Sequence, residues 1–170
     1  MGNDCTKPNE NMYFQSRKRA ATYNDKLKSR EGAAELLGVS VSSLADYELG
    51  NTKVVPVDKV VLMSDLYGDP ELSACYCKHE CPIGKDYPIA MKMSPIERTT
   101  VRLVHDLDAG KIDDVKRTVL EIASDGVIDS EEVAELDRLM EYLDELTEDI
   151  WNLRMICQRA KFELEHKNEK

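Results

Sequence analysis

The segment from Cys75 to Cys81 gathers four side chains that can bind a metal ion or react as thiols. Its sequence, CYCKHEC, places Cys75, Cys77, His79 and Cys81 within seven residues. Thiolates and imidazoles are the usual ligands of structural zinc, and thiolates also hold iron–sulfur clusters. Structural zinc sites usually draw pairs of ligands from two separated segments, and four ligands this close together strain a tetrahedron. We therefore expect packed cysteines beside an exposed His79, with zinc or iron binding and a redox-active thiol as the alternatives.

The other reactive residues do not favour catalysis. The three histidines, His79, His105 and His166, lie in neither a Ser/His/Asp arrangement nor the His-Glu-x-x-His zinc motif. No Gly-rich loop of the phosphate-binding type is present. The sequence therefore predicts a protein that is not an enzyme and has no cofactor, apart from the metal alternative for the cysteine segment.

Residues 29–50, SREGAAELLGVSVSSLADYELG, predict two short helices joined by a tight turn. Gly38 is expected to end the first helix, because glycine readily adopts the left-handed conformation found there. The hydroxyl of Ser40 can cap the second helix by accepting from a free backbone N–H, and Gly50 is expected to end that helix. The small and apolar residues that share one face of the first helix are Ala33, Ala34 and Leu37.

This segment resembles the helix-turn-helix of the lambda-repressor/Cro-like (Xre-family) regulators of bacteria and phage. The resemblance covers roughly residues 10–70 and implies an N-terminal five-helix DNA-binding domain. The elements that match in register are Ala34, the Gly38-Val39-Ser40 turn, Leu44 and the closing Glu48-Leu49-Gly50.

The resemblance also implies which residues meet DNA. Base edges would be read by Val41, Ser42, Ser43 and Asp46, and the phosphate backbone would be contacted by Arg30 and by Asn51, Thr52 and Lys53. The chemistry fits, because valine can meet a thymine methyl group, serine can bond several base edges and aspartate can accept from a cytosine amino group.

The second helix departs from the family pattern, because its outer face carries no Arg, Gln or Asn. Two half-sites bound by a dimer would compensate for this weak contact. We expect Glu48 to stabilise the fold, with Arg17 or Arg19 as its ion-pair partner.

The chain as a whole is acidic, with a formal net charge of −10. Residues 1–60 carry nine basic and eight acidic residues, whereas residues 96–170 carry eleven basic and twenty acidic residues. A polyanion would therefore dock on the N-terminal part and be repelled by the C-terminal part.

The sequence predicts an all-α protein, because no segment alternates with a period of two. We expect a disordered N-terminus (1–9), a helix-turn-helix DNA-binding domain (10–81), a proline-containing linker (82–95) and an acidic helical hairpin or coiled-coil domain (96–170). In the first domain, one helix is expected over about 10–27 and another to end near Ala74. In the last domain, Gly110 is expected to end a helix whose apolar face holds Ile96, Thr100, Leu103, Val104 and Leu107.

The last predicted helix carries apolar or small residues every seven positions, in two series three positions apart. This pattern predicts a coiled-coil seam that is longer than the preceding helices can cover, so that part of it pairs with a second copy. The alternative is a three-helix hairpin bundle whose last helix projects beyond its partners. Leu143 and Ile150 are expected to be buried at this contact. The series are Leu136, Leu143, Ile150, Cys157 and Leu164, and Leu139, Leu146, Leu153 and Ala160. The residues assigned to dimerisation are Leu136, Leu139, Leu143, Leu146, Ile150 and Leu153.

Together these patterns predict a sequence-specific transcriptional regulator that binds double-stranded DNA as a homodimer. The odd number of cysteines, five, and the polar N-terminus favour the cytoplasm, and no apolar run is long enough to span a membrane. The alternative is a protein–protein interaction scaffold that keeps the helix-turn-helix fold without binding DNA.

Overall fold

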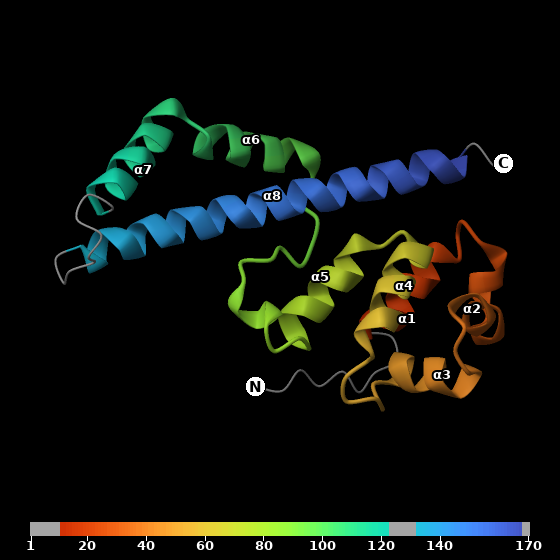
Figure 1. The fold of residues 1–170 in the computed structure, drawn as a ribbon. Coiled ribbons are helices and arrows are strands. Elements are labelled where there is room, and N and C mark those ends of the chain that lie inside the picture. Colours follow the sequence, from red (N-terminus) through yellow and green to blue (C-terminus); the bar gives the residue numbers. More distant parts are fainter. Residues whose placement is uncertain (1–10, 123–131, 168–170) are drawn as a thin grey trace. The chain divides into compact units, whose positions relative to one another are not determined.

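The computed structural model describes residues 11–122 and 132–167, and all regular structure in these residues is helical (Figure 1). The predicted disordered segment 1–9 lies outside this range. The described chain forms two compact units. Unit 1 contains the chain up to Asp86 together with the segment from Cys157 onward, and unit 2 runs from Tyr87 to Ile156.

Unit 1 begins with five α-helices that pack around one hydrophobic core (Figure 1). They are α1 (Met12–Ala20), α2 (Arg30–Leu37), α3 (Val41–Leu49), α4 (Val57–Tyr67) and α5 (Pro70–His79). Short 3-10 helices, η2 (Asp25–Lys28) and η3 (Gly84–Asp86), follow α1 and α5. The largest fully buried apolar side chains of the core are Leu27, Leu44, Met63 and Leu72.

Local capping signals set the bounds of α2 and α3. Gly38 ends α2 with φ of 62°, a conformation that costs other residues roughly 1–2 kcal/mol. The hydroxyl of Ser40 then accepts from the backbone N–H of Ser43 at 3.0 Å and starts α3. Gly50 ends α3 with φ of 73°. These three predictions from the sequence are confirmed.

Two helix boundaries differ from the prediction. The helix expected over about 10–27 is interrupted after Ala20, because the Asn24 side chain accepts from the Lys26 backbone and starts η2. The helix expected to end near Ala74 continues to His79.

The end of α8 (Val133–Lys167) belongs to unit 1. Arg159 donates to the buried carboxylate of Asp69 at 3.0 Å, and Arg19 binds the same carboxylate from α1. Phe162 occupies the space that a side chain at Gly68 would need, because a Cβ built there would lie 2.2 Å from its ring. This segment is therefore an integral part of the bundle.

Unit 2 contains α6 (Ile96–Asp106), α7 (Ala109–Ile122) and the first part of α8. Its α6–α8 contact is largely polar. Asn152 donates to Thr99 at 3.0 Å, and Arg102 pairs with Asp149 at 3.0 Å. Among the described residues of this unit, few hydrophobic side chains are buried: Ala90, Leu103, Leu139 and Met155.

The predicted apolar face of α6 is mostly exposed. Ile96, Val104 and Leu107 are 50%, 69% and 54% exposed, and of the predicted set Leu103 is the buried member. Thr99 faces inward instead, because Asn152 of α8 donates a hydrogen bond to its hydroxyl. The prediction that Gly110 ends this helix is also wrong, because α6 stops at Asp106 and Gly110 lies in the first turn of α7.

None of the described helices combines the length and the apolar character that a membrane span requires.

Candidate nucleic-acid interface

The start of α3 is an ordered cluster of hydroxyl groups. The Oγ of Ser40 lies 2.9 Å from the Oγ of Ser42 and 2.8 Å from that of Ser43. Ser42 is exposed, whereas Ser43 is half-buried. Because the cap orients these hydroxyls, the first turn of α3 presents Ser42 to solvent in a defined position.

The outer face of α3 carries the other residues predicted to read bases. Val41 is 41% exposed, and Asp46 is exposed one turn after Ser42 on the same face. Asn51 Nδ2 donates to Asp46 Oδ1 at 3.0 Å. One of the carboxylate oxygens of Asp46 is therefore engaged by the chain itself.

The loop after α3 is anchored at both ends. The backbone N–H of Asn51 donates to the carbonyl of Asp46, and the backbone N–H of Val55 donates to Glu80 at 3.3 Å. Glu80 also accepts from the hydroxyl of Tyr13, and burial together with this carboxylate raises the Tyr13 pKa far above its usual value. The anchored loop carries half-buried Thr52 and exposed Lys53.

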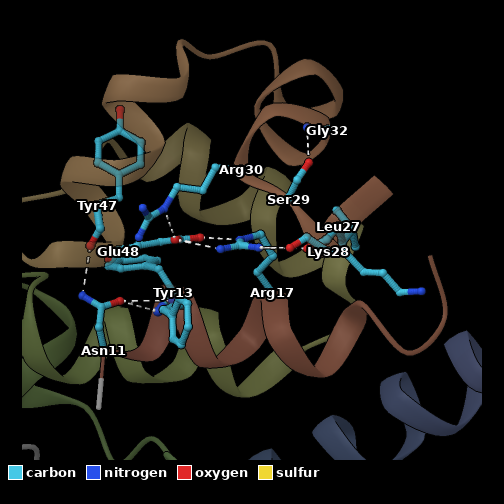
Figure 2. A network of polar contacts seen from close by, with 11 residues as sticks. Asn11, Tyr13, Arg17, Leu27, Lys28, Ser29, Arg30, Gly32, Tyr47 and Glu48 are labelled. Atoms are coloured by element: carbon cyan, nitrogen blue, oxygen red, sulfur yellow. Dashed lines mark hydrogen bonds and ion pairs between the residues drawn. The ribbon is translucent and has the colours of Figure 1, made fainter. Parts of the chain in front are cut away.

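Figure 2 shows the polar network beneath this surface, centred on the fully buried Glu48. Arg17 binds its carboxylate with two donors, Nε at 2.5 Å and Nη2 at 2.9 Å, and Arg30 Nε donates at 2.7 Å. Arg17 Nη1 also donates to the carbonyl of Leu27 at 2.9 Å. The hydrogen bonds to Glu48 raise the pKa of Arg17, so it stays charged. The predicted structural role of Glu48, with Arg17 as partner, is confirmed.

The same network connects α1 to α3. The side chain of Asn11 caps α1 by accepting from the backbone of Tyr13 and Phe14, and its Nδ2 donates to the carbonyl of Tyr47 at 2.9 Å (Figure 2). These contacts hold the inner side of α3 to α1, so the outer face of α3 keeps a fixed orientation on the bundle.

Arg30, predicted to contact DNA, lies at the edge of this network, and its side chain is 33% exposed. Its Nε donates to Glu48, and its terminal amines bond to no residue in the described part of the chain. The three charges of Arg17, Arg30 and Glu48 leave an excess of one positive charge at the start of α2.

The remaining cations of this surface differ in how they are paired. Lys53 forms no ion pair with any residue of the ranges 11–122 and 132–167. Lys26 and Lys28 are 58% and 65% exposed and lie near Glu35 and Asp25. Lys53 and the terminal amines of Arg30 are therefore the cationic groups best placed to meet a phosphate.

The cysteine segment lies on α5 and the turn that follows it. Cys75, Cys77 and Cys81 are half-buried, and His79 is exposed, as predicted. Cys77 and Cys81 pack against the hydrophobic core, and burial raises the pKa of the Cys77 thiol. No group of three or more potential ligands is placed for a metal ion within the described residues. Cys77 and Cys81 therefore act as packing residues of the core.

The residues predicted for dimerisation on α8 differ in how much of each side chain is exposed. Leu139 is buried, and Ile150 is 45% exposed. Half-buried positions are Leu136, Leu143, Leu146 and Leu153. Sequence reasoning missed the Arg159–Asp69 ion pair, because Arg159 lies off the seven-residue pattern and its partner is 90 residues away.

Comparison of the chain with protein-family models, with curated proteins and with solved structures gives no match. The assignment to a family therefore stays a prediction from the helix-turn-helix residues.

Proposed function

We propose that the protein is a sequence-specific DNA-binding regulator of transcription that inserts α3 into the major groove. The observation that carries the proposal is the α2–turn–α3 arrangement. Gly38 and Ser40 set the turn, and the exposed residues Val41, Ser42 and Asp46 lie together on the outer face of α3. An α-helix fits the major groove, where side chains at its start reach base edges.

Phosphate contacts on both sides of α3 would position it. Arg30 starts α2, its terminal amines form no hydrogen bond with described residues, and Lys53 lies on the anchored loop after α3. Contacts of this kind fix the register on the duplex and supply most of the affinity, whereas base contacts supply the specificity.

The base-reading surface is small and weakly charged. Val41 can contact a thymine methyl group, the Ser42 hydroxyl can bond either a donor or an acceptor, and the free oxygen of Asp46 can accept from a cytosine amino group. The outer face of α3 offers no arginine for a bidentate bond to guanine. A single copy would therefore bind weakly, and we propose that two copies occupy two half-sites about one turn of DNA apart, ~34 Å.

A second function has its own support. Asp46 places a negative charge on the outer face of α3, and Val41 and Leu49 expose 41% and 39% of their surface beside it. A surface of this kind also suits a protein partner. In that case the helix-turn-helix would serve as a protein–protein interaction scaffold.

Fluorescence anisotropy with a random-sequence duplex, titrated with salt, separates the two functions. DNA binding predicts that the affinity falls as salt rises, and that Lys53→Ala lowers the salt slope by roughly one phosphate contact, about 0.9. Lys85→Ala is the matched control, because it removes the same charge from an exposed position on η3 of the same unit.

The specificity is tested by selecting preferred duplexes for the unaltered protein and for Ser42→Ala, which should change the preferred sequence. The scaffold function is supported instead if the folded protein binds no duplex at low salt, or if Lys53→Ala and Lys85→Ala have equal effects.

A further inference from the structure

The C-terminal half of α8 has two opposite faces with different surroundings. A step of two residues turns an α-helix by about 200°, so Ile150 lies opposite Asn152, and Cys157 lies opposite Met155. Asn152 and Met155 are 4% and 1% exposed. Ile150 is 45% exposed, and Cys157 is also exposed.

The exposed face continues the seven-residue pattern to Leu164, about one turn before the helix ends at Lys167. We call this surface the free seam; it consists of Ile150, Leu153, Cys157, Ala160 and Leu164. Leu153 is half-buried, and Leu164 is 65% exposed. On the side of the helix facing away from this seam, Arg159 and Phe162 hold α8 to Asp69 and Gly68. In each unit, packing therefore uses one face of its own stretch of α8 and leaves the seam residues of that stretch exposed or half-buried.

We propose that the free seam pairs with the free seam of a second copy as a parallel two-stranded coiled coil. A seam with a period of seven packs best against a helix of the same period, and a second α8 is such a helix. Ile150 occupies the first core position of the heptad and Leu153 the second. A β-branched residue followed by leucine in these positions favours two parallel strands.

The charges beside the seam also favour the parallel orientation. Arg154 and Lys161 are exposed and occupy the same flanking position in successive heptads. In an antiparallel pair these positions face each other, so the two cations would meet. In a parallel pair each instead faces the residue five positions earlier on the partner helix, which is Asp149 for Arg154 and Ile156 for Lys161, so the two cations do not meet.

The structure also narrows the predicted dimerisation set. Leu139 is buried within unit 2, so the start of the pattern already has partners in its own chain. The free seam spans only 15 residues, ~21 Å, and such a short contact predicts a dimer that dissociates on dilution.

This contact goes beyond DNA binding and does not depend on it. The segment from Cys157 onward belongs to the unit that carries the helix-turn-helix. Parallel pairing would therefore bring the two helix-turn-helix units to the same end of the dimer, as two half-sites require.

Sedimentation equilibrium of the full chain without DNA tests the interface. We expect a concentration-dependent dimer that Ile150→Asp weakens by at least about tenfold, because the new charge would be buried between the two helices. Leu164→Asp should act in the same way. Both side chains are exposed in the single chain, so the helical circular dichroism should not change. The matched control is Val101→Asp on α6, which alters a side chain that is 70% exposed and should leave the dimer intact.

The orientation is tested by oxidation with diamide, which takes two electrons and two protons from two thiols as their S–S bond forms. A parallel pair places Cys157 opposite its counterpart, so mass spectrometry should find the Cys157–Cys157 peptide. In a variant carrying Cys157→Ser and Gln158→Cys, the thiol leaves the seam and this link should be largely lost.

A monomer at every concentration, or a dimer that Val101→Asp dissociates and Ile150→Asp does not, overturns the interface. A dimer that the seam variants dissociate but that forms no Cys157 link overturns the parallel orientation. A chain that binds DNA yet stays monomeric at every concentration would refute this contact and leave DNA recognition standing.

Discussion

Replacement of Glu48 by Gln should destabilise unit 1 strongly. The substitution keeps the size of the side chain and removes its negative charge. The guanidinium of Arg17, whose side chain is 3% exposed, would then be buried without a counter-charge. One amide hydrogen-bond donor would also face the donors of Arg17 and Arg30. Removing one partner of a buried ion pair costs about 3–5 kcal/mol.

The neighbouring pair gives the matched control. Arg30→Ala removes the other guanidinium, which is 33% exposed, and leaves Glu48 with two bonds from Arg17. Partly exposed pairs contribute about 0–1 kcal/mol. Glu48→Gln should therefore cost several times more than Arg30→Ala. For a unit of this size, the larger loss lowers the melting temperature by more than about 10 °C.

Urea unfolding measures the total loss, and amide hydrogen exchange read by mass spectrometry places it along the chain. Peptides from α1 and α3 should lose protection in Glu48→Gln, with peptides from α6 and α7 as the internal reference. Equal unfolding free energies for the two variants would refute the reasoning, because the buried charge of Arg17 would then need no partner. So would a loss of protection confined to α6 and α7.

Two further substitutions test other parts of the fold. Gly68→Ala should destabilise unit 1 more than Gly38→Ala does, as measured by urea unfolding. Both residues have positive φ, but a Cβ at Gly68 meets the ring of Phe162, whereas one at Gly38 meets nothing within 4 Å. Equal losses of unfolding free energy would show that Phe162 moves aside freely. Asp149→Asn should stabilise unit 2 at pH 7, because burial raises the pKa of Asp149 above its ordinary 3.8 despite Arg102. The cost of burying the charged carboxylate is complete above the raised pKa and absent below the ordinary pKa. The advantage of Asn over Asp in unfolding free energy should therefore disappear as the pH falls through the range between these two pKa values. An advantage that does not change with pH would contradict this cause.

Local chemistry made the turn between α2 and α3 predictable. A glycine with a left-handed backbone and a serine that caps the next helix act within about four residues, so Gly38 and Ser40 could be assigned from the sequence. The ion-pair partner of Glu48 could be assigned only from the tertiary structure. Arg17 and Arg19 lie two residues apart on α1 and point about 200° apart, so the packing of α1 decides that Arg17 meets Glu48 and Arg19 meets Asp69.

The same division holds for the cysteines and for α6. Four residues of metal-binding types within seven positions indicated a candidate site, but ligation needs several side chains to converge on one point, which spacing alone does not establish. The apolar pattern of α6 predicted a helix, yet Thr99 faces α8 while Val104 faces solvent, because the hydrogen bond from Asn152 favours that rotation.

The seven-residue pattern of α8 shows, along one helix, the same distinction between what the sequence determines and what the tertiary structure determines. The sequence by itself determined the helix and its period, because both follow from the spacing of residues along one chain. Only the tertiary structure decided that Leu139 is buried in its own unit and that Ile150 and Leu164 are exposed. The physical reason is that a helix of 35 residues is shared between two units, and each unit packs against its own stretch of it. Each stretch of its surface is covered or exposed according to that packing.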